Sequence, residues 1–142
     1  SRPLRVVRVY FHLDVGGIEA RLVDLLPRLD RRRFDVRMLC TRRLGRLAPE
    51  MTARGIPVEV CRYRSKLPMF ASVWPLARRL RRLAPDVVHA HGETPVHVAT
   101  VAARRAGVPI VIGQFHTSRL FREGPRQLAR ERRSAPGSNG RC

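Results

Sequence analysis

The feature that most constrains the fold is a double-glycine turn, Gly16-Gly17, which separates a strand pattern from a helix pattern. Residues 6–11 form a β-branched and aromatic run that is typical of a buried strand. Within residues 22–29, leucines recur at the spacing of one helix face.

A strand, a glycine turn and a helix in this order bring backbone N–H groups and the positive end of a helix dipole to one point. That point favours anions, phosphates above all. We also expect the two glycines to adopt φ values that other residues avoid. A tight connection without a ligand is the alternative for Gly16 and Gly17.

Strand and helix patterns alternate along the rest of the chain. Further strands are predicted at residues 34–40, 56–61, 86–91 and 108–112, and further helices at residues 47–54, 72–83 and 95–106. The order predicts an α/β fold, a Rossmann-like parallel sheet of at least five strands with helices on both faces. A ligand crevice is then expected at the carboxyl ends of the strands. Pro27 is expected to bend the last turn of the first helix.

The alternating pattern stops after Ser118. We therefore expect residues 1–118 to form the Rossmann-like domain, and residues 119–142 to form a basic helix and a linker-like tail, so that the domain is incomplete. The longest apolar runs are too short to cross a membrane, and no signal-peptide pattern opens the chain. A cytoplasmic location is the expectation.

The chain is strongly basic, with a formal net charge of +18. Such a field favours anionic partners, whether nucleotide-sugar diphosphates, acidic lipid surfaces or nucleic acid. The aromatic content of 6% offers few stacking platforms, which makes a nucleic-acid partner unlikely on sequence grounds. The helix at residues 72–83 carries Trp74 and four arginines that could contact an anionic membrane peripherally: Arg78, Arg79, Arg81 and Arg82. A solvated arginine face is the alternative.

Polar residues follow the strands at one edge of the predicted sheet. They are His12 and Asp14 after the first strand, His89, His91, Gly92 and Glu93 at the fourth, and Gln114, His116 and Thr117 after the fifth. Alternation puts His89 and His91 on the same side of their strand. No carboxylate or cysteine completes a ligand set with these histidines, so no metal is expected. A histidine that donates to a phosphate or a sugar hydroxyl is favoured instead.

Other nucleotide-binding patterns are missing from the sequence. The chain has no P-loop, and its glycine turn lacks the G-x-G-x-x-G spacing of a nicotinamide dehydrogenase. The cysteines have no metal-ligand spacing either. Cys40 and Cys61, which close two predicted strands, are expected to be inert thiols that could lie side by side in the sheet.

Four segments, in this order and spacing, resemble the N-terminal domain of family-4, GT-B-type retaining glycosyltransferases. They are residues 13–19 (LDVGGIE), 54–58 (RGIPV), 85–91 (PDVVHAH) and 107–109 (GVP), the last followed by a strand and His116. The resemblance implies two Rossmann-like domains that face each other across a cleft and need no metal or other cofactor. The N-terminal domain mainly binds the acceptor, and the C-terminal domain holds the nucleotide-sugar.

The resemblance also implies roles for individual residues. The Gly16 and Gly17 amides would contact the donor diphosphate. His116, with Thr117 beside it at the phosphate, matches the loop histidine that points at the reacting sugar, and is the candidate catalytic residue. The acceptor side would be lined by His12, Asp14, His91, Gly92 and Glu93.

The family's donor-binding half has no counterpart in the 142 residues. The resemblance implies that the full-length parent is a hexosyltransferase that acts on a cell-envelope glycan, a lipid-linked sugar or a small molecule. Because the donor-binding half is missing from these residues, we expect this chain to be inactive alone. The alternatives are a basic nucleic-acid-binding module and one half of a GT-B-shaped sugar-nucleotide epimerase.

Overall fold

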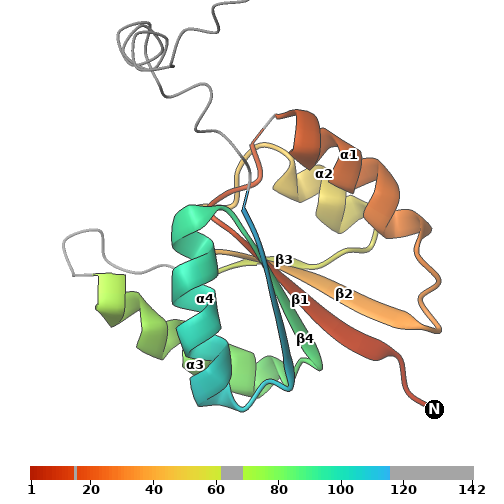
Figure 1. Cartoon of the computed structure of the whole chain (residues 1–142). Helices are drawn as coiled ribbons and strands as arrows, with labels where there is room; N and C mark the ends of the chain where they lie inside the picture. Colours follow the sequence, from red (N-terminus) through yellow and green to blue (C-terminus); the bar gives the residue numbers. More distant parts are fainter. Residues whose placement is uncertain (15, 62–68, 116–142) are drawn as a thin grey trace, which may run out of the picture.

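Five parallel strands form the centre of the protein in a computed structural model that describes residues 1–14, 16–61 and 69–115 (Figure 1). The strands are β1 (Leu4–Tyr10), β2 (Phe34–Cys40), β3 (Val58–Val60), β4 (Val87–His91) and β5 (Ile110–Gln114), in the spatial order β3-β2-β1-β4-β5. The α/β prediction is confirmed. The chain first adds strands on one side of β1 and then on the other. The carboxyl ends of β1 and β4 therefore flank the switch point where such sheets bind ligands.

Helices cover both faces of the sheet, as the alternating pattern predicts (Figure 1). They are α1 (Gly17–Leu25), α2 (Ala48–Ala53), α3 (Val73–Leu83) and α4 (Glu93–Ala106), with 3-10 turns η1 (Leu26–Arg28) and η2 (Met69–Ser72). Pro27 changes α1 in the expected place: the α-helix ends at Leu25, and the chain continues as η1, which contains the proline. A missing N–H at Pro27 explains why the α-helical ladder stops there.

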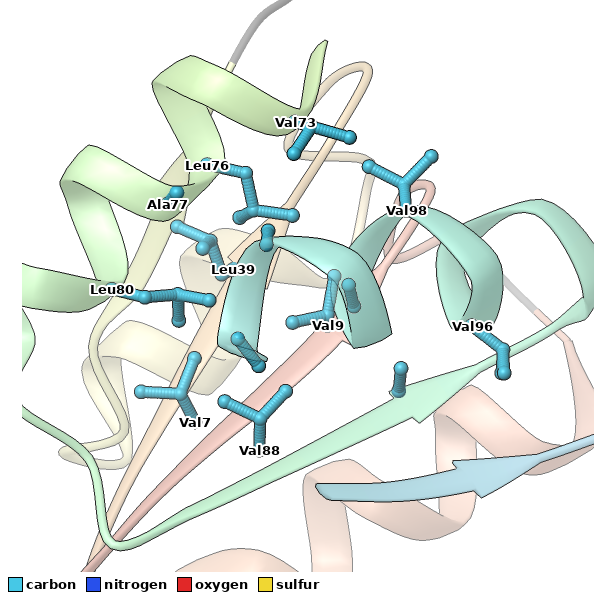
Figure 2. Close-up of a cluster of buried hydrophobic side chains, with 14 residues drawn as sticks. Val7, Val9, Leu39, Val73, Leu76, Ala77, Leu80, Val88, Val96 and Val98 are labelled. Carbon is cyan, nitrogen blue, oxygen red and sulfur yellow. The ribbon is translucent and has the colours of Figure 1, made fainter. Parts of the chain in front are cut away.

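Two buried clusters hold the layers together, one on each face of the sheet. On the face covered by α3 and α4, valines of β1 and β4 pack against the apolar stripe of α3, as Figure 2 shows for Val7, Val88 and Leu80. On the opposite face, Leu22 of α1 and Met51 of α2 pack against alternate residues of β1 and β2. The period of two along each strand explains this division.

The buried cluster under α1 and α2 does not extend to β5. Ile110 and Ile112 lie on the same face as α1 and α2 but remain 51% and 46% exposed. The described helices on this side pack over β1, β2 and β3. Part of the sheet surface around β4 and β5 is therefore open within the described structure.

The two internal cysteines are neighbours, as the sequence suggests, but on opposite faces. The Cys61 N–H donates to the Cys40 carbonyl (2.8 Å), while Cys40 belongs to the cluster under α1 and α2, and Cys61 packs against the other. Both thiols are free. Burial raises the pKa of Cys40 to about 12, so the buried thiol stays protonated and inert.

An ion pair ties the amino-terminal residues to the start of β4. Arg2 makes two hydrogen bonds to the Asp86 carboxylate, each 2.7 Å long, and the Arg5 N–H donates a third at 2.8 Å. These bonds stabilise the charged form, so the pKa of Asp86 lies well below its usual range.

Candidate functional site

The loop after β1 is fixed by the loop after β2. The Leu13 N–H donates to the Leu44 carbonyl (3.1 Å), and the Leu13 carbonyl accepts from the Leu47 N–H (2.9 Å). Gly45, between them, has a φ of +82°, and a Cβ at this position would lie 2.4 Å from the Leu13 carbonyl carbon. Only glycine satisfies both conditions without strain, so Gly45 allows the close approach that positions the β1–α1 loop.

Asp14 adds an electrostatic clamp between the same two loops. Its carboxylate pairs with the Arg43 guanidinium and accepts from the Arg46 N–H (3.2 Å), and His12 Nδ1 lies 3.3 Å from Oδ2. The resemblance gives Asp14 and His12 to the acceptor side. In the structure the Asp14 carboxylate is engaged inside the protein, whereas the His12 side chain is 39% exposed and reachable from solvent.

The glycine turn itself is extended backbone that leads into a helix. Gly16 is the N-cap of α1, with φ −146° and ψ 166°, and neither Gly16 nor Gly17 has a positive φ. The expectation that these glycines adopt φ values closed to other residues is therefore wrong. At Gly16 a Cβ would meet the end of the Glu19 side chain, and at Gly17 it would meet none of the residues that the structure describes within 4 Å.

The space beside Gly17, at the amino end of α1, is not filled by any described residue. The helix begins there without a side-chain cap hydrogen bond, and the Glu19 carboxylate of its first turn lies beside Gly16. Such a place suits an anion that must approach the backbone closely.

At the end of β4, two histidines lie together on one face, which confirms the prediction from strand alternation. The ring centroids of His89 and His91 are 4.1 Å apart. His91 stacks on Tyr10 at 4.3 Å and is only 4% exposed. His91 is therefore buried, whereas His89 is half-buried. The Nε2 atom of His89 lies 3.2 Å from Gln114 Oε1. Burial, and then the positive charge of Arg8, lower the pKa of His89.

Gly92 turns the chain from β4 into α4 at the same edge. Its φ is +88°, its N–H donates to the Gln114 carbonyl (3.0 Å), and it caps a helix that begins with Glu93. His116 and Thr117 lie outside the residues that the structure describes.

Arg8 and Tyr10 contact the predicted site residue His91, but the sequence motifs did not indicate them. Arg8 Nη2 lies 2.7 Å from His91 Nε2 and donates to the Tyr10 hydroxyl at 3.1 Å. A guanidinium only donates, so His91 Nε2 accepts and its ring proton is on Nδ1. A signal was present, since Arg8 interrupts the apolar run of residues 6–11 with a charge.

The parallel register gathers these groups at one end of the sheet. Tyr10, His91 and Gln114 are the last residues of β1, β4 and β5, and the glycine turn and Gly92 follow at the same edge. In the described ranges no group of three or more His, Cys, Asp or Glu side chains is arranged to hold a metal ion.

A second surface lies along α3, where a pocket of about 680 Å³ is lined by Val60, Cys61, Trp74, Pro75, Arg78, Arg79, Arg81 and Arg82. Trp74 is 60% exposed, and the Arg105 guanidinium carbon lies 4.7 Å from its ring centroid. Arg79 pairs with Glu59. None of the helices among the described residues is long and apolar enough to cross a bilayer.

A family model described as Glycosyltransferase Family 4 matches residues 15–139, most of the chain. The matched region begins at the glycine turn and includes every element from α1 to β5. No curated protein matches the chain.

Proposed function

Because the chain belongs to glycosyltransferase family 4, we propose that it is the acceptor-side domain of an enzyme that moves a sugar from a nucleotide-sugar to an acceptor. The acceptor is a glycan, a lipid-linked sugar or a small molecule. We expect the complete enzyme to retain the anomeric configuration and to need no metal. Sugar transfer also requires a donor-binding domain, so the 142 residues alone are expected to be inactive.

The observation that carries the proposal is the open space at Gly17. The backbone there does not need a glycine, because φ is not positive and a Cβ would contact no described residue within 4 Å. A ligand that approaches the first turn of α1 does need one. The diphosphate of a nucleotide-sugar is an anion of suitable size and charge for the amides of Gly16 and Gly17.

The remaining assignments follow the edge of the sheet. His116 is proposed as the residue that faces the reacting sugar, with Thr117 beside it at the diphosphate. Gly92 and Glu93, at the start of α4, and His12 are proposed to contact the acceptor. Asp14 and His91 are proposed to stabilise the same edge of the sheet. Asp14 holds the β1–α1 loop by accepting a hydrogen bond from Arg46, and His91 stacks on Tyr10.

Titration of the ¹⁵N-labelled chain with pyrophosphate tests the proposed anion site. We expect weak, saturable shifts that are largest at the Gly16 and Gly17 amides, because the nucleotide-binding groups belong to another domain. Shifts confined to the α3 surface, with none at the glycine turn, would contradict the proposal. So would tight binding of a nucleotide-sugar to this chain alone.

The proposal includes a peripheral contact with anionic membrane through the α3 surface. The supporting observation is the exposed Trp74 ring beside the arginines of α3, a combination suited to a headgroup region. Co-sedimentation with phosphatidylglycerol vesicles is expected to weaken in the double variant Arg78→Gln/Arg82→Gln. The charge-matched control Arg31→Gln/Arg33→Gln, on the loop before β2, should bind as the parent does. Equal losses in both variants would indicate net charge rather than a contact surface.

A further inference from the structure

Arg8 places a charge on the central strand of the sheet. β1 lies between β2 and β4, and Arg8 is paired in register with His89. A half-buried guanidinium in this position loses much of its hydration, which is costly unless an anion compensates it. None of the ion pairs among the side chains that the structure describes involves Arg8.

The two groups that accept hydrogen bonds from Arg8 are neutral, although the Glu19 carboxylate lies near enough to Tyr10 to raise the pKa of its hydroxyl. The hydrogen bonds of Arg8 go from Nη2 to the Tyr10 hydroxyl and to the neutral ring of His91. Burial raises the pKa of Tyr10 and lowers that of His89, so neither carries charge at neutral pH. Arg8 Nε is buried and has no hydrogen-bond partner within the described structure. A guanidinium presents five donors, and the acceptors found among the described side chains engage only one of its nitrogens.

The face of β4 and β5 beside Arg8 is partly exposed and has a mixed character. His89 and Gln114 provide polar ring and amide groups, and Ile112, on the same face of β5, is 46% exposed. A flat apolar surface next to a cation and hydrogen-bonding groups suits a sugar ring that carries an acidic substituent.

We propose that Arg8 binds an oxyanion of the acceptor, a carboxylate or a phosphate, so that the acceptor of this glycosyltransferase is an acidic sugar. The inference rests on the proposed acceptor-side function. In this arrangement the terminal nitrogens of the guanidinium donate to two oxygens of the anion. His89 and Gln114 contact the ring hydroxyls, and His91 and Tyr10 hold the guanidinium in place. Arg8 is thus a specificity-determining residue rather than a catalytic one.

The test uses the full chain with three sugar probes: D-glucuronate, D-glucose 6-phosphate and neutral D-glucose. The Arg8 Nε–Hε signal and the ring signals of His89 and His91 are followed by NMR. We expect saturable shifts with glucuronate, with glucose 6-phosphate or with both, and none with glucose. A response to one acid alone identifies the anion as carboxylate or phosphate. No response to either acid would overturn the proposal.

Matched variants separate a specific contact from general charge. Arg8→Gln should weaken binding of the acidic sugar about tenfold or more, as expected for loss of hydrogen bonds to a charged group. Arg37→Gln removes the same charge from β2 on the opposite face and should leave binding unchanged. Equal weakening in both variants would refute the role of Arg8. If Arg8→Gln does not fold, the responses of the parent chain to the three probes still decide whether the proposal holds.

The same samples distinguish this inference from the proposed function. Pyrophosphate shifts at Gly16 and Gly17 should persist in Arg8→Gln, because that site is built from backbone amides. Retained pyrophosphate binding without acidic-sugar binding would remove only the inference about Arg8. Absence of a pyrophosphate response in the parent chain would contradict the proposed anion site at the glycine turn.

Discussion

Replacement of Gly45 by alanine should loosen the β1–α1 loop and destabilise the protein. Two costs combine at this position. A non-glycine residue at φ +82° pays about 1–2 kcal/mol for the left-handed conformation. In addition, its Cβ would lie 2.4 Å from the carbonyl atoms of Leu13, where backbone must shift, and overpacking of this kind costs about 1–3 kcal/mol.

Gly107→Ala is the matched control for the first cost. Gly107 also has a positive φ, +76°, but a Cβ there would contact nothing within 4 Å. The difference between the two variants therefore isolates the contact with Leu13. With a urea m-value of about 1–3 kcal/mol per molar, we expect Gly45→Ala to unfold at a midpoint about 1 M below that of Gly107→Ala.

Urea unfolding followed by circular dichroism at 222 nm measures both midpoints. Hydrogen exchange provides a local readout, because the Leu13 and Leu47 N–H groups should exchange faster in Gly45→Ala than in Gly107→Ala. Equal midpoints and equal exchange would refute the argument that Gly45 holds the loop by close approach.

Three further perturbations test other parts of the structure. Asp86→Asn should destabilise the protein at neutral pH. Because the folded pKa of Asp86 lies below the unfolded value of about 3.9, its contribution is complete above that pH and is lost on acidification. Urea midpoints of parent and variant should thus converge as the pH falls, and a constant gap would contradict this. Leu80→Ala, which removes a fully buried side chain between α3 and the sheet, should cost about 2–5 kcal/mol in the same assay, and a cost below about 1 kcal/mol would mean that Leu80 is not packed as described. Cys40, whose pKa is raised to about 12, should resist alkylation at pH 8 until urea unfolds the chain, and rapid labelling of the native protein would show that it is not buried.

The strands and helices could be predicted because their signals are local. Residues 34–40 were expected to form a strand, and β2 has those bounds. Pro27 correctly marked the end of the α-helical ladder of α1. Period-two alternation also gave the shared face of His89 and His91, since it depends only on positions within one strand.

The conformation of Gly16 and Gly17 could not be predicted in the same way. A double glycine permits positive φ without requiring it, and the extended N-cap depends on how α1 begins. Positive φ values occur instead at other glycines, among them Gly45, whose close contact with Leu13 brings together two separate loops.

The contact of Arg8 with His91 depends on register, which the sequence does not state. The two residues are 83 positions apart and meet only because β1 and β4 are paired in parallel. A charge within an apolar strand indicated that Arg8 needed a partner, but not which one. The stacking of His91 on Tyr10 depends on the same pairing of β1 with β4.

One variant tests, with two readouts, whether the space at Gly17 serves a ligand rather than the fold. Gly17→Ala, at the first position of α1, should leave the urea midpoint equal to or slightly above that of the parent, because the backbone accepts alanine there. The same variant should lose the pyrophosphate-induced shifts of the Gly16 and residue 17 amides. Undiminished pyrophosphate shifts in a stably folded Gly17→Ala protein would contradict a role of this space in ligand binding.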